Sequence, residues 1–520
     1  MSATTKSILS ADKVNSKITT SGGIIHSQWD EEVPITLNGH LPYFSEFLHA
    51  GGLFEGLVRN CPLEYKSNNA PAVGDVLGTM LLSILCGHTR YRHAGALYGD
   101  MASAEILGIN RLVSYDSLRR AFEKVDDQAA RKWLQNELLY CCEPLLSAGY
   151  ILDIDPTVKP LYGHQEGAEK GYNPKKPGRP SHCYHSYFIA NLRLVLEAEI
   201  HAGNETAGRY SHESLWNLLD HRLPRHLHPR LIRGDIGFGN EETMTGCEER
   251  RTKFLFKLKQ SANVKKLLAQ LEKDNYCWKD AGDNWQGFET RLQLMGWTSS
   301  RRVIVLRRRK QKKHKPEISH ALLTTNEETI QQGLLFPEII TQPEEPEYDW
   351  VILVTNLDYS IEALGQLYRD RGDCENIFDE LKNQWGWSGF TTQDIKRSGI
   401  MARLIALIYN WWNIFCRLAD PDKHLEAQTS RPLLQRVIGR LTNRGGKRLI
   451  HLTAVGAQAS ETKRLFEEIS AFINNLISTA TQLNQVYIWT AILARAFKVF
   501  LRGKPILPGA EGNQILLPMT

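Results

Sequence analysis

The segment YRDRGDCENIFDELK, residues 368–382, contains the most informative pattern in this chain. Tyr368, Arg371, Glu375 and Lys382 are separated by offsets of three, four and seven residues. At 3.6 residues per turn, those offsets predict that all four side chains lie on one face of a single helix. Such a face presents a carboxylate between two cations and a phenol, a set suited to holding a metal ion and a phosphodiester. The alternative is an ordinary salt-bridged helix surface, because charged pairs four residues apart are common.

The order Tyr-x2-Arg-x3-Glu-x6-Lys closely resembles the signature of a large group of bacterial insertion-sequence transposases of the DDE type. Those enzymes have a ribonuclease H-like core in which two Asp and one Glu bind divalent metal. The resemblance, which extends over residues 146–420, therefore implies two aspartates upstream of Glu375, each at the end of a strand.

The segment GYILDIDPTVKPLYG, residues 149–163, supplies the first of these aspartates. Its alternating apolar positions predict a core strand. Regular pairing is expected to stop at Pro156, which cannot donate a backbone hydrogen bond. Asp155-Pro156-Thr157 matches the Asp-x-Thr form that the family has at this site, so Asp155 is the favoured ligand. Asp153 lies two residues earlier on the same strand face and remains the alternative.

The second aspartate is expected in RLIRGDIGFGNEE, residues 230–242. A short apolar run there ends in Gly234-Asp235, and further glycines follow that let backbone approach a ligand closely. A plain Asp-Gly turn is the other interpretation of this pattern. Because it falls between Asp155 and Glu375 in the order that the resemblance requires, Asp235 is the natural second carboxylate.

The bulk composition is that of a soluble globular protein with several domains. The chain has 520 residues, of which 42% are hydrophobic and 23% charged, and a net charge of +5. Such a length exceeds what one compact core accommodates. Nine scattered cysteines without a Cys-x2-Cys pair favour buried free thiols over disulfides or a zinc site. The most apolar segment, residues 80–86, is far shorter than the roughly 20 residues of a membrane span.

Positive charge is concentrated in a few segments, which favours contact with DNA phosphates. The most basic is RRVIVLRRRKQKKHK, residues 301–315, and a second cluster covers residues 440–448. A solvated basic strand or loop is the alternative interpretation. Trp285 and Trp297 precede the first basic segment and are candidates for an aromatic clamp on an extruded base, with packing as their other role. The possible DNA contacts are Arg119, Arg120, Lys175, Lys176, Arg179, Trp285, Trp297, Arg307, Arg308 and Arg309.

The pattern along the chain, together with what the resemblance implies, predicts six regions. These are a loosely ordered terminus (1–30), a helical region expected to bind DNA ends (31–146), the first part of the core (147–260), a β-rich insertion subdomain (261–348), the second part of the core (349–420) and a C-terminal helical region (421–520). Trp411 and Trp412 are expected to pack in a long apolar helix that follows residue 382. The predicted fold class is thus α/β, with a ribonuclease H-like core, a β-rich insertion and flanking helical regions.

The resemblance implies a DNA transposase that binds the ends of an insertion sequence and moves it by cut-and-paste. Asp155, Asp235 and Glu375 would hold two Mg²⁺ ions, for which Mn²⁺ can substitute, and Tyr368, Arg371 and Lys382 would bind DNA phosphates. The implied partners are double-stranded DNA, as terminal inverted repeats and target, and a second copy of the chain. The implied location is the bacterial cytoplasm, at the nucleoid when bound to DNA. Two alternatives stay open: a ribonuclease H-like nuclease without strand transfer, and a non-catalytic DNA-binding derivative.

Overall fold

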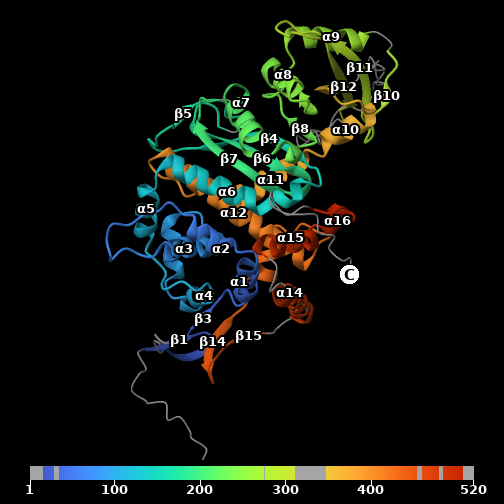
Figure 1. Cartoon of the computed structure of the whole chain (residues 1–520). Helices are drawn as coiled ribbons and strands as arrows, with labels where there is room; N and C mark the ends of the chain where they lie inside the picture. Colours follow the sequence, from blue (N-terminus) through green and yellow to red (C-terminus); the bar gives the residue numbers. More distant parts are fainter. Residues whose placement is uncertain are drawn as a thin grey trace, which may run out of the picture. The chain divides into compact units, whose positions relative to one another are not determined.

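The computed structural model describes residues 16–27, 34–174, 176–205, 207–273, 276–310, 347–453, 459–479 and 484–506. The chain divides into two compact units (Figure 1). Unit 1 comprises residues 1–137, 380–391 and 404–520, and unit 2 comprises residues 138–379 and 392–403. The long helices α6 (Asp127–Leu146), α11 (Gly372–Gln384) and α12 (Ile395–Ala419) each contribute residues to both units.

Unit 2 is built on one mixed sheet, to which ten of the described strands belong. The strands are β4 (Ile151–Pro160), β5 (Glu169–Lys170), β6 (Pro180–Ile189), β7 (Leu194–Ala202), β8 (Leu231–Gly234), β9 (Phe254–Lys257), β10 (Lys279–Asp280), β11 (Gln286–Leu292), β12 (Arg301–Arg309) and β13 (Tyr348–Thr355). Their order is β10-β11-β12-β13-β9-β8-β4-β6-β5, with β7 also paired to β6. Figure 1 shows this sheet with helices α7 (Ala207–Asn217), α8 (Glu241–Glu249), α9 (Ala262–Lys273) and α10 (Ile361–Arg369).

Strand direction changes along the sheet. β4 pairs in parallel with β8, and β8 in parallel with β9, whereas β6 and β7 are antiparallel neighbours on the other side of β4. On the far side, β13 pairs antiparallel with β9 and with β12. The described strands of the predicted insertion, β10 to β12, therefore extend the same sheet through β13 and do not form a sheet of their own.

Strand β4 is longer than the sequence predicts. Pairing with β6 continues past Pro156 as far as Pro160, opposite Ser181. The carbonyl of Tyr150 accepts a hydrogen bond from the β8 side, from the amide of Arg230 at 2.9 Å. Backbone groups alternate between the two edges of a strand, so the missing N–H of Pro156 also faces the β8 side, where the parallel ladder has already ended. The proline therefore removes no hydrogen bond between β4 and β6.

Unit 1 is mainly helical. Its helices are α1 (Leu41–Ala50), α2 (Leu53–Arg59), α3 (Val73–Leu85), η2 (Tyr91–Leu97), α4 (Met101–Ile106), α5 (Tyr115–Lys124), α13 (Ala427–Leu434), α14 (Ala459–Thr479), α15 (Gln485–Ala496) and α16 (Lys498–Leu501). Trp411 and Trp412 are buried in α12, as predicted, and the Trp412 indole N–H donates to Ser430 at 2.8 Å. None of the described helices is long and apolar enough to cross a membrane.

Two small β elements also occur among the described residues. Residues 16–27, within a segment expected to be loosely ordered, form the hairpin of β1 (Ser16–Thr20) and β2 (Gly23–Ser27). In unit 1, β14 (Gly439–Arg444) and β15 (Lys447–Leu452) form a second hairpin that is joined at its base by β3 (Ile35–Thr36). The prediction that residues 421–520 are helical is therefore wrong for this hairpin, whose turn is set by two glycines, Gly445 and Gly446, with φ of 58° and 74°.

Candidate active site

Two neighbouring parallel strands, β4 and β8, bring Asp155 and Asp235 together at their carboxyl ends. The last pair in the parallel register of β4 and β8 is Ile154 opposite Gly234, and each aspartate is the next residue along its own strand direction. Asp235 then enters a turn in which its carbonyl accepts from the amide of Phe238 at 3.0 Å. A side chain at Gly234 would meet the Phe238 Cβ at 2.9 Å, so glycine permits this turn to fold back closely.

Asp153, the alternative ligand, is occupied by a buried ion pair. Its two carboxylate oxygens accept from Nε and Nη2 of Arg233 at 2.7 and 2.8 Å, and the Asp153 side chain is fully buried. Arg233 also donates to the carbonyl of Leu367 near the end of α10. Asp153 therefore serves to hold Arg233, and through it to fix α10 against the sheet, rather than to present a free carboxylate.

The residues of the YRDRGDCENIFDELK segment lie on two helices, so the prediction of one continuous helix is wrong. α10 ends at Arg369, and α11 begins at Gly372. Around this break the amides of Arg371 and Cys374 donate to carbonyls three residues back, Tyr368 at 3.2 Å and Arg371 at 2.9 Å. The chain is thus wound more tightly there than in an α-helix, and Gly372, a poor helix former, is the first residue of α11.

The break directs Arg371 into the carboxylate cluster. Its Nη2 lies 2.8 Å from Oδ2 of Asp155, and Arg371 is only 7% exposed. The thiol of Cys374 donates to the same oxygen at 3.8 Å. Tyr368 packs against the hydrophobic cluster that includes Leu353 and Leu364. Burial raises the pKa of the Tyr368 phenol to about 12, and its electrostatic partners include Arg371, Asp235 and Asp155.

The surroundings of Asp155, above all its burial, raise its pKa to about 7. Burial is the largest cause, because it disfavours the ionised form, and the Arg371 guanidinium acts in the opposite direction. The negative charges of Asp235, Asp153 and Glu375 raise the pKa further. The charges of Asp235 and Glu375 therefore both act on the pKa of Asp155, so the three predicted carboxylates form one electrostatic cluster.

The remaining members of the segment occupy different turns of α11. Glu375 is exposed in the first turn, and the neighbouring Asp373 pairs with Arg193 at 2.6 Å. Lys382 lies in the last turn, in the part of the helix that belongs to unit 1. The structure thus gathers Tyr368, Arg371 and Glu375 around Asp155 and Asp235, whereas the placement of Lys382 beside them stays a prediction.

The chemistry of this cluster fits a hard divalent cation. Carboxylate oxygens are the ligands that Mg²⁺ prefers, and a cation would relieve the repulsion that raises the pKa of Asp155. Within the residues that the structure describes, no three His, Cys, Asp or Glu side chains are arranged closely enough to hold a metal ion. In this conformation Arg371 supplies positive charge at Asp155 instead.

The basic segment that begins at Arg301 is largely neutralised in its described part. Arg301 is buried and donates to Glu241 and Glu248, and Arg302 pairs with Glu289 at 2.8 Å. Arg307 stacks on the rings of Trp278 and Tyr348, with 3.8 and 4.6 Å to their centroids. Arg301 therefore joins β12 to α8 and is not available to DNA, and Arg302 joins β12 to β11.

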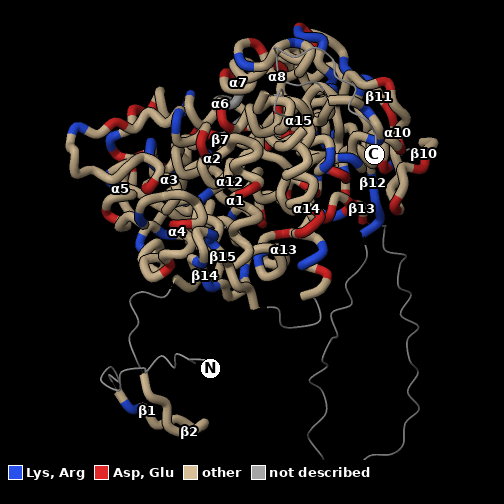
Figure 2. The backbone as a smooth tube through the Cα atoms, turned by 60° about the horizontal axis from the view of Figure 1, so that its bottom comes forward, with Lys and Arg blue, Asp and Glu red and all other residues tan. Residues whose placement is uncertain are grey.

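Farther along β12 the side chains reach the surface. Arg308 is exposed and lies 3.6 Å from Asp349 and 4.8 Å from the ring centroid of Trp285. Arg309 is exposed as well, and Figure 2 shows Lys and Arg at this end of β12. Residues 311–315, the rest of the predicted basic run, lie outside the described residues.

The two candidate clamp tryptophans differ in their surroundings. Trp285 is partly buried and packs against the cluster formed by Ile304, Leu306 and their neighbours. Trp297 lies in the turn between β11 and β12, half-buried, with the Arg301 guanidinium 5.4 Å from its ring centroid. The packing role is therefore favoured for Trp285, and Trp297 is the better placed of the two for contact with a ligand.

The other basic candidates are on the surface. Lys176 and Arg179 lie over the ring of the exposed Tyr162, at 5.0 and 4.8 Å from its centroid, while Lys175 is outside the described residues. Arg119 and Arg120 are exposed on α5, whose N-terminus is capped by Ser114.

Sequence reasoning missed Arg233 and Cys374, both of which shape the site. Arg233 is a charged residue inside the otherwise apolar strand LIRG, and such a residue generally needs a buried partner. That signal, together with the unexplained Asp153, would have predicted their pairing. Cys374 directly precedes Glu375 in the sequence and carries no comparable signal.

The fold and the site together define an α/β protein with a carboxylate cluster at the carboxyl ends of two interior strands of a mixed sheet. The family model described as "Transposase DDE domain group 1" matches residues 52–474. Because this match covers most of the chain, the protein belongs to that family of DDE transposases. One similar solved chain comes from the cryo-EM structure of the piggyBac transposase synaptic complex with hairpin DNA. It has 12% sequence identity and a TM-score of 0.34, over 88% of this chain and 85% of that one. The comparison with curated proteins finds no match.

Proposed function

We propose that this protein is a transposase that binds the ends of a bacterial insertion sequence and cuts and rejoins DNA by metal-dependent phosphodiester transfer. The observation that carries the proposal is the register of β4 and β8, which puts Asp155 and Asp235 side by side at the ends of parallel strands. Glu375 acts electrostatically on Asp155 from the first turn of α11. The family match over residues 52–474 supports the same conclusion.

The strand arrangement supports a ribonuclease H-like core. Three long strands, β4, β6 and β7, which only the two-residue strand β5 interrupts in chain order, form an antiparallel meander. β8 and β9 then add in parallel on the other side of β4. The resulting order β7-β6-β4-β8-β9 is the order expected for that core. In it the first and fourth strands are neighbours, and these are the strands that the two aspartates follow.

In the proposed reaction Asp155, Asp235 and Glu375 are the metal ligands. Two bound Mg²⁺ ions would activate the attacking hydroxyl and stabilise the leaving oxygen of the phosphodiester. Asp155 must be ionised to act as a ligand, and Arg371 favours that form by its charge. Tyr368, Arg371 and Lys382 would orient phosphate oxygens, Arg371 through its planar fork and Lys382 as a point charge.

The proposal also includes the assembly that such a reaction needs. Cut-and-paste movement of an element requires both of its ends, which carry the terminal inverted repeats, and a target duplex. We infer that two copies of the chain act together, one at each element end. Cytoplasmic action at the bacterial nucleoid follows from that substrate.

A nuclease that cuts without joining is the main competing function. The two are distinguished by supplying pre-cleaved element ends with free 3′-hydroxyls, a supercoiled target plasmid and Mg²⁺. A transposase joins the ends to the plasmid and produces single- or double-end insertions. Cleavage of intact ends without any joined product would favour the nuclease, and binding without cleavage would favour the non-catalytic derivative.

Arg371→Ala is expected to reduce end cleavage on the order of 100-fold, because it removes a charge that faces the reacting phosphate. The protein should stay folded, although its melting temperature should fall, since the buried Asp155 loses its partner. Arg302→Ala is the matched control, because it removes a partly buried pair with Glu289 and hydrogen bonds to the carbonyls of Leu357 and Tyr359, and cleavage by the folded protein should be unchanged. Equal loss of stability and activity in Arg371→Ala would favour a structural salt bridge.

Trp297→Ala is expected to slow hairpin closure on pre-nicked element ends on the order of tenfold. An extruded base that stacks on an aromatic ring gains ~1–3 kcal/mol, and the turn between β11 and β12 holds Trp297 at the surface. Trp285→Ala should instead lower the melting temperature, since Trp285 packs on the core. If both variants close hairpins at the wild-type rate, neither residue is a clamp.

A further inference from the structure

The hairpin of β14 and β15 has two chemically different faces. Its register places Arg440 opposite His451, Thr442 opposite Leu449, and Arg444 opposite Lys447. Because side chains alternate along a strand, these six residues share one face of the ribbon. The intervening residues, Leu441, Asn443, Arg448 and Ile450, share the other face.

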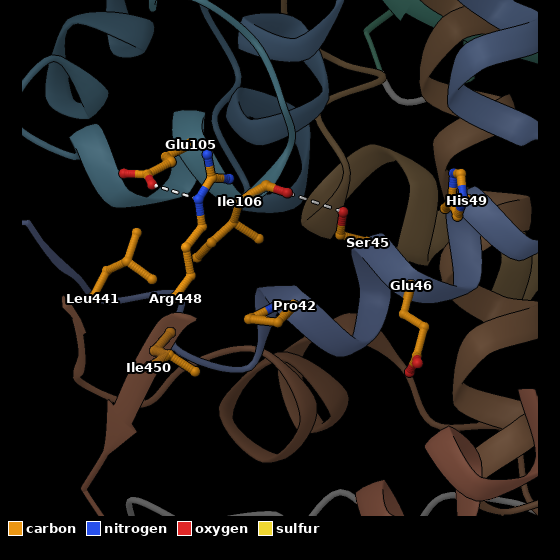
Figure 3. Close-up of a pocket in the computed structure, with 9 residues that line it drawn as sticks. All are labelled: Pro42, Ser45, Glu46, His49, Glu105, Ile106, Leu441, Arg448 and Ile450. Carbon is orange, nitrogen blue, oxygen red and sulfur yellow. Dashed lines mark hydrogen bonds and ion pairs between the residues drawn. The ribbon is translucent and has the colours of Figure 1, made fainter. Parts of the chain in front are cut away.

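The second face is anchored to unit 1. Leu441 is buried, and Leu441, Arg448 and Ile450 line a pocket together with residues of α1 and α4 (Figure 3). Figure 3 shows Arg448 reaching to Glu105, with Nε 3.3 Å from Oε1. At the base, β3 pairs with Gly439 and Arg440. The hairpin is therefore held by contacts on one side, which fixes the direction in which its opposite face points.

The opposite face, formed by residues 440, 442, 444, 447, 449 and 451, is the outer face of the hairpin. Apart from the half-buried Thr442, all of these residues are exposed. In the described part of the chain, the side chains of Arg440, Arg444 and Lys447 take part in no ion pair. No Asp or Glu occurs between residues 439 and 453. Figure 2 marks the Lys and Arg of β14 and β15 in blue.

This concentration of charge opposes formation of the hairpin. Like charges directly opposite one another across two strands are destabilising, and Arg444 faces Lys447 in this way. On α14, by contrast, exposed cations have acidic partners, in the Lys463–Glu467 and Arg464–Glu468 pairs. An anionic ligand that spans the outer face would relieve the repulsion.

We propose that the outer face of the β14–β15 hairpin is a second DNA-binding surface, at which Arg440, Arg444 and Lys447 contact phosphates of duplex DNA. The major groove of DNA admits a two-stranded ribbon, and the glycine turn at Gly445 and Gly446 keeps the tip narrow. Phosphate contacts of this kind strengthen binding without reading sequence. The inference rests on the proposed function, because the hairpin would add phosphate contacts to the same DNA that the carboxylate cluster is proposed to cut.

The test compares the full-length wild type with the triple variant R440Q/R444Q/K447Q in titrations of a generic DNA duplex at several salt concentrations. Each lost phosphate contact lowers the slope of log K against log salt by about 0.9, so the triple variant should lose about two to three units. The matched control is K463Q/R464Q/K498Q, which removes the same charge from α14 and α16 and should keep the wild-type slope.

The outcomes separate this inference from the proposed function. If the wild type binds and cuts DNA and the hairpin variant keeps the wild-type salt slope, the inference is wrong and the proposed function stands. The same conclusion follows if the hairpin variant only self-associates, because the charges would then serve to keep the β15 edge from pairing with other chains. If the wild type binds no DNA, the proposed function itself fails.

Discussion

Asp155→Asn is expected to lower strand cleavage at an element end on the order of 1,000-fold or more, with DNA binding nearly unchanged. An amide keeps the shape of the side chain but removes the charge that a divalent cation requires, so the loss falls on the chemical step. The measurement is a gel assay of end cleavage in Mg²⁺, with DNA binding followed in parallel by anisotropy.

Asp153→Asn is the matched variant for this experiment. Asp153 lies on the same strand two residues earlier, but both of its oxygens are bound by Arg233. Its substitution should lower stability, while the folded fraction keeps measurable cleavage. Loss of cleavage in a stably folded Asp153→Asn protein, with cleavage retained in Asp155→Asn, would contradict the assignment of Asp155.

Arg233→Met is expected to destabilise unit 2 by about 3–5 kcal/mol, the usual cost of leaving one partner of a buried pair unpaired. Asp153 is fully buried, and burial already raises its pKa despite the opposing effect of Arg233. The loss of the Arg233 contact with the Leu367 carbonyl should also loosen the end of α10. Urea unfolding followed by tryptophan fluorescence measures the change.

The double variant D153L/R233M provides the control for this effect. Replacing a buried pair by apolar side chains of similar size is often neutral or stabilising, so the double variant should recover much of the lost stability. If the single variant unfolds at the wild-type urea concentration, the pair does not support the fold. If the double variant is no better than the single one, the loss comes from packing or the Leu367 contact rather than from an unpaired charge.

The carboxylate cluster was largely predictable because strand ends leave a strong sequence signal. An apolar run that stops at an acidic residue fixes where the residue lies along the strand, and the resemblance supplied the order in which three such sites occur. The parallel register that makes Asp155 and Asp235 neighbours could not be deduced in this way, since pairing depends on residues 80 positions apart. The structure supplies that register.

The break before α11 was harder to foresee. The offsets between Tyr368, Arg371 and Glu375 fit a continuous helix, and Gly372 was the single local sign against it. Tertiary contacts decide the outcome, because Arg371 reaches Asp155 and Arg233 holds the carbonyl of Leu367. Contacts between distant segments override helical periodicity here.

The basic segments show a similar limit of local reasoning. Arg301 and Arg440 are both members of basic runs, yet Arg301 is buried between two glutamates and Arg440 is exposed on a hairpin. Composition indicates positive charge in both places, but it does not say which charges are already neutralised. The partners lie on other elements, so the difference becomes visible only in the folded chain.

The most direct test of the account is cleavage of a duplex that contains the element end, measured in Mg²⁺ for the wild type and for Asp155→Asn, Asp235→Asn and Glu375→Gln. We expect that the wild type cuts at the end, that chelation of the metal with EDTA stops cleavage, and that each of the three variants binds the duplex without cutting. Cleavage that persists in EDTA, or in any one of the three variants, would contradict it.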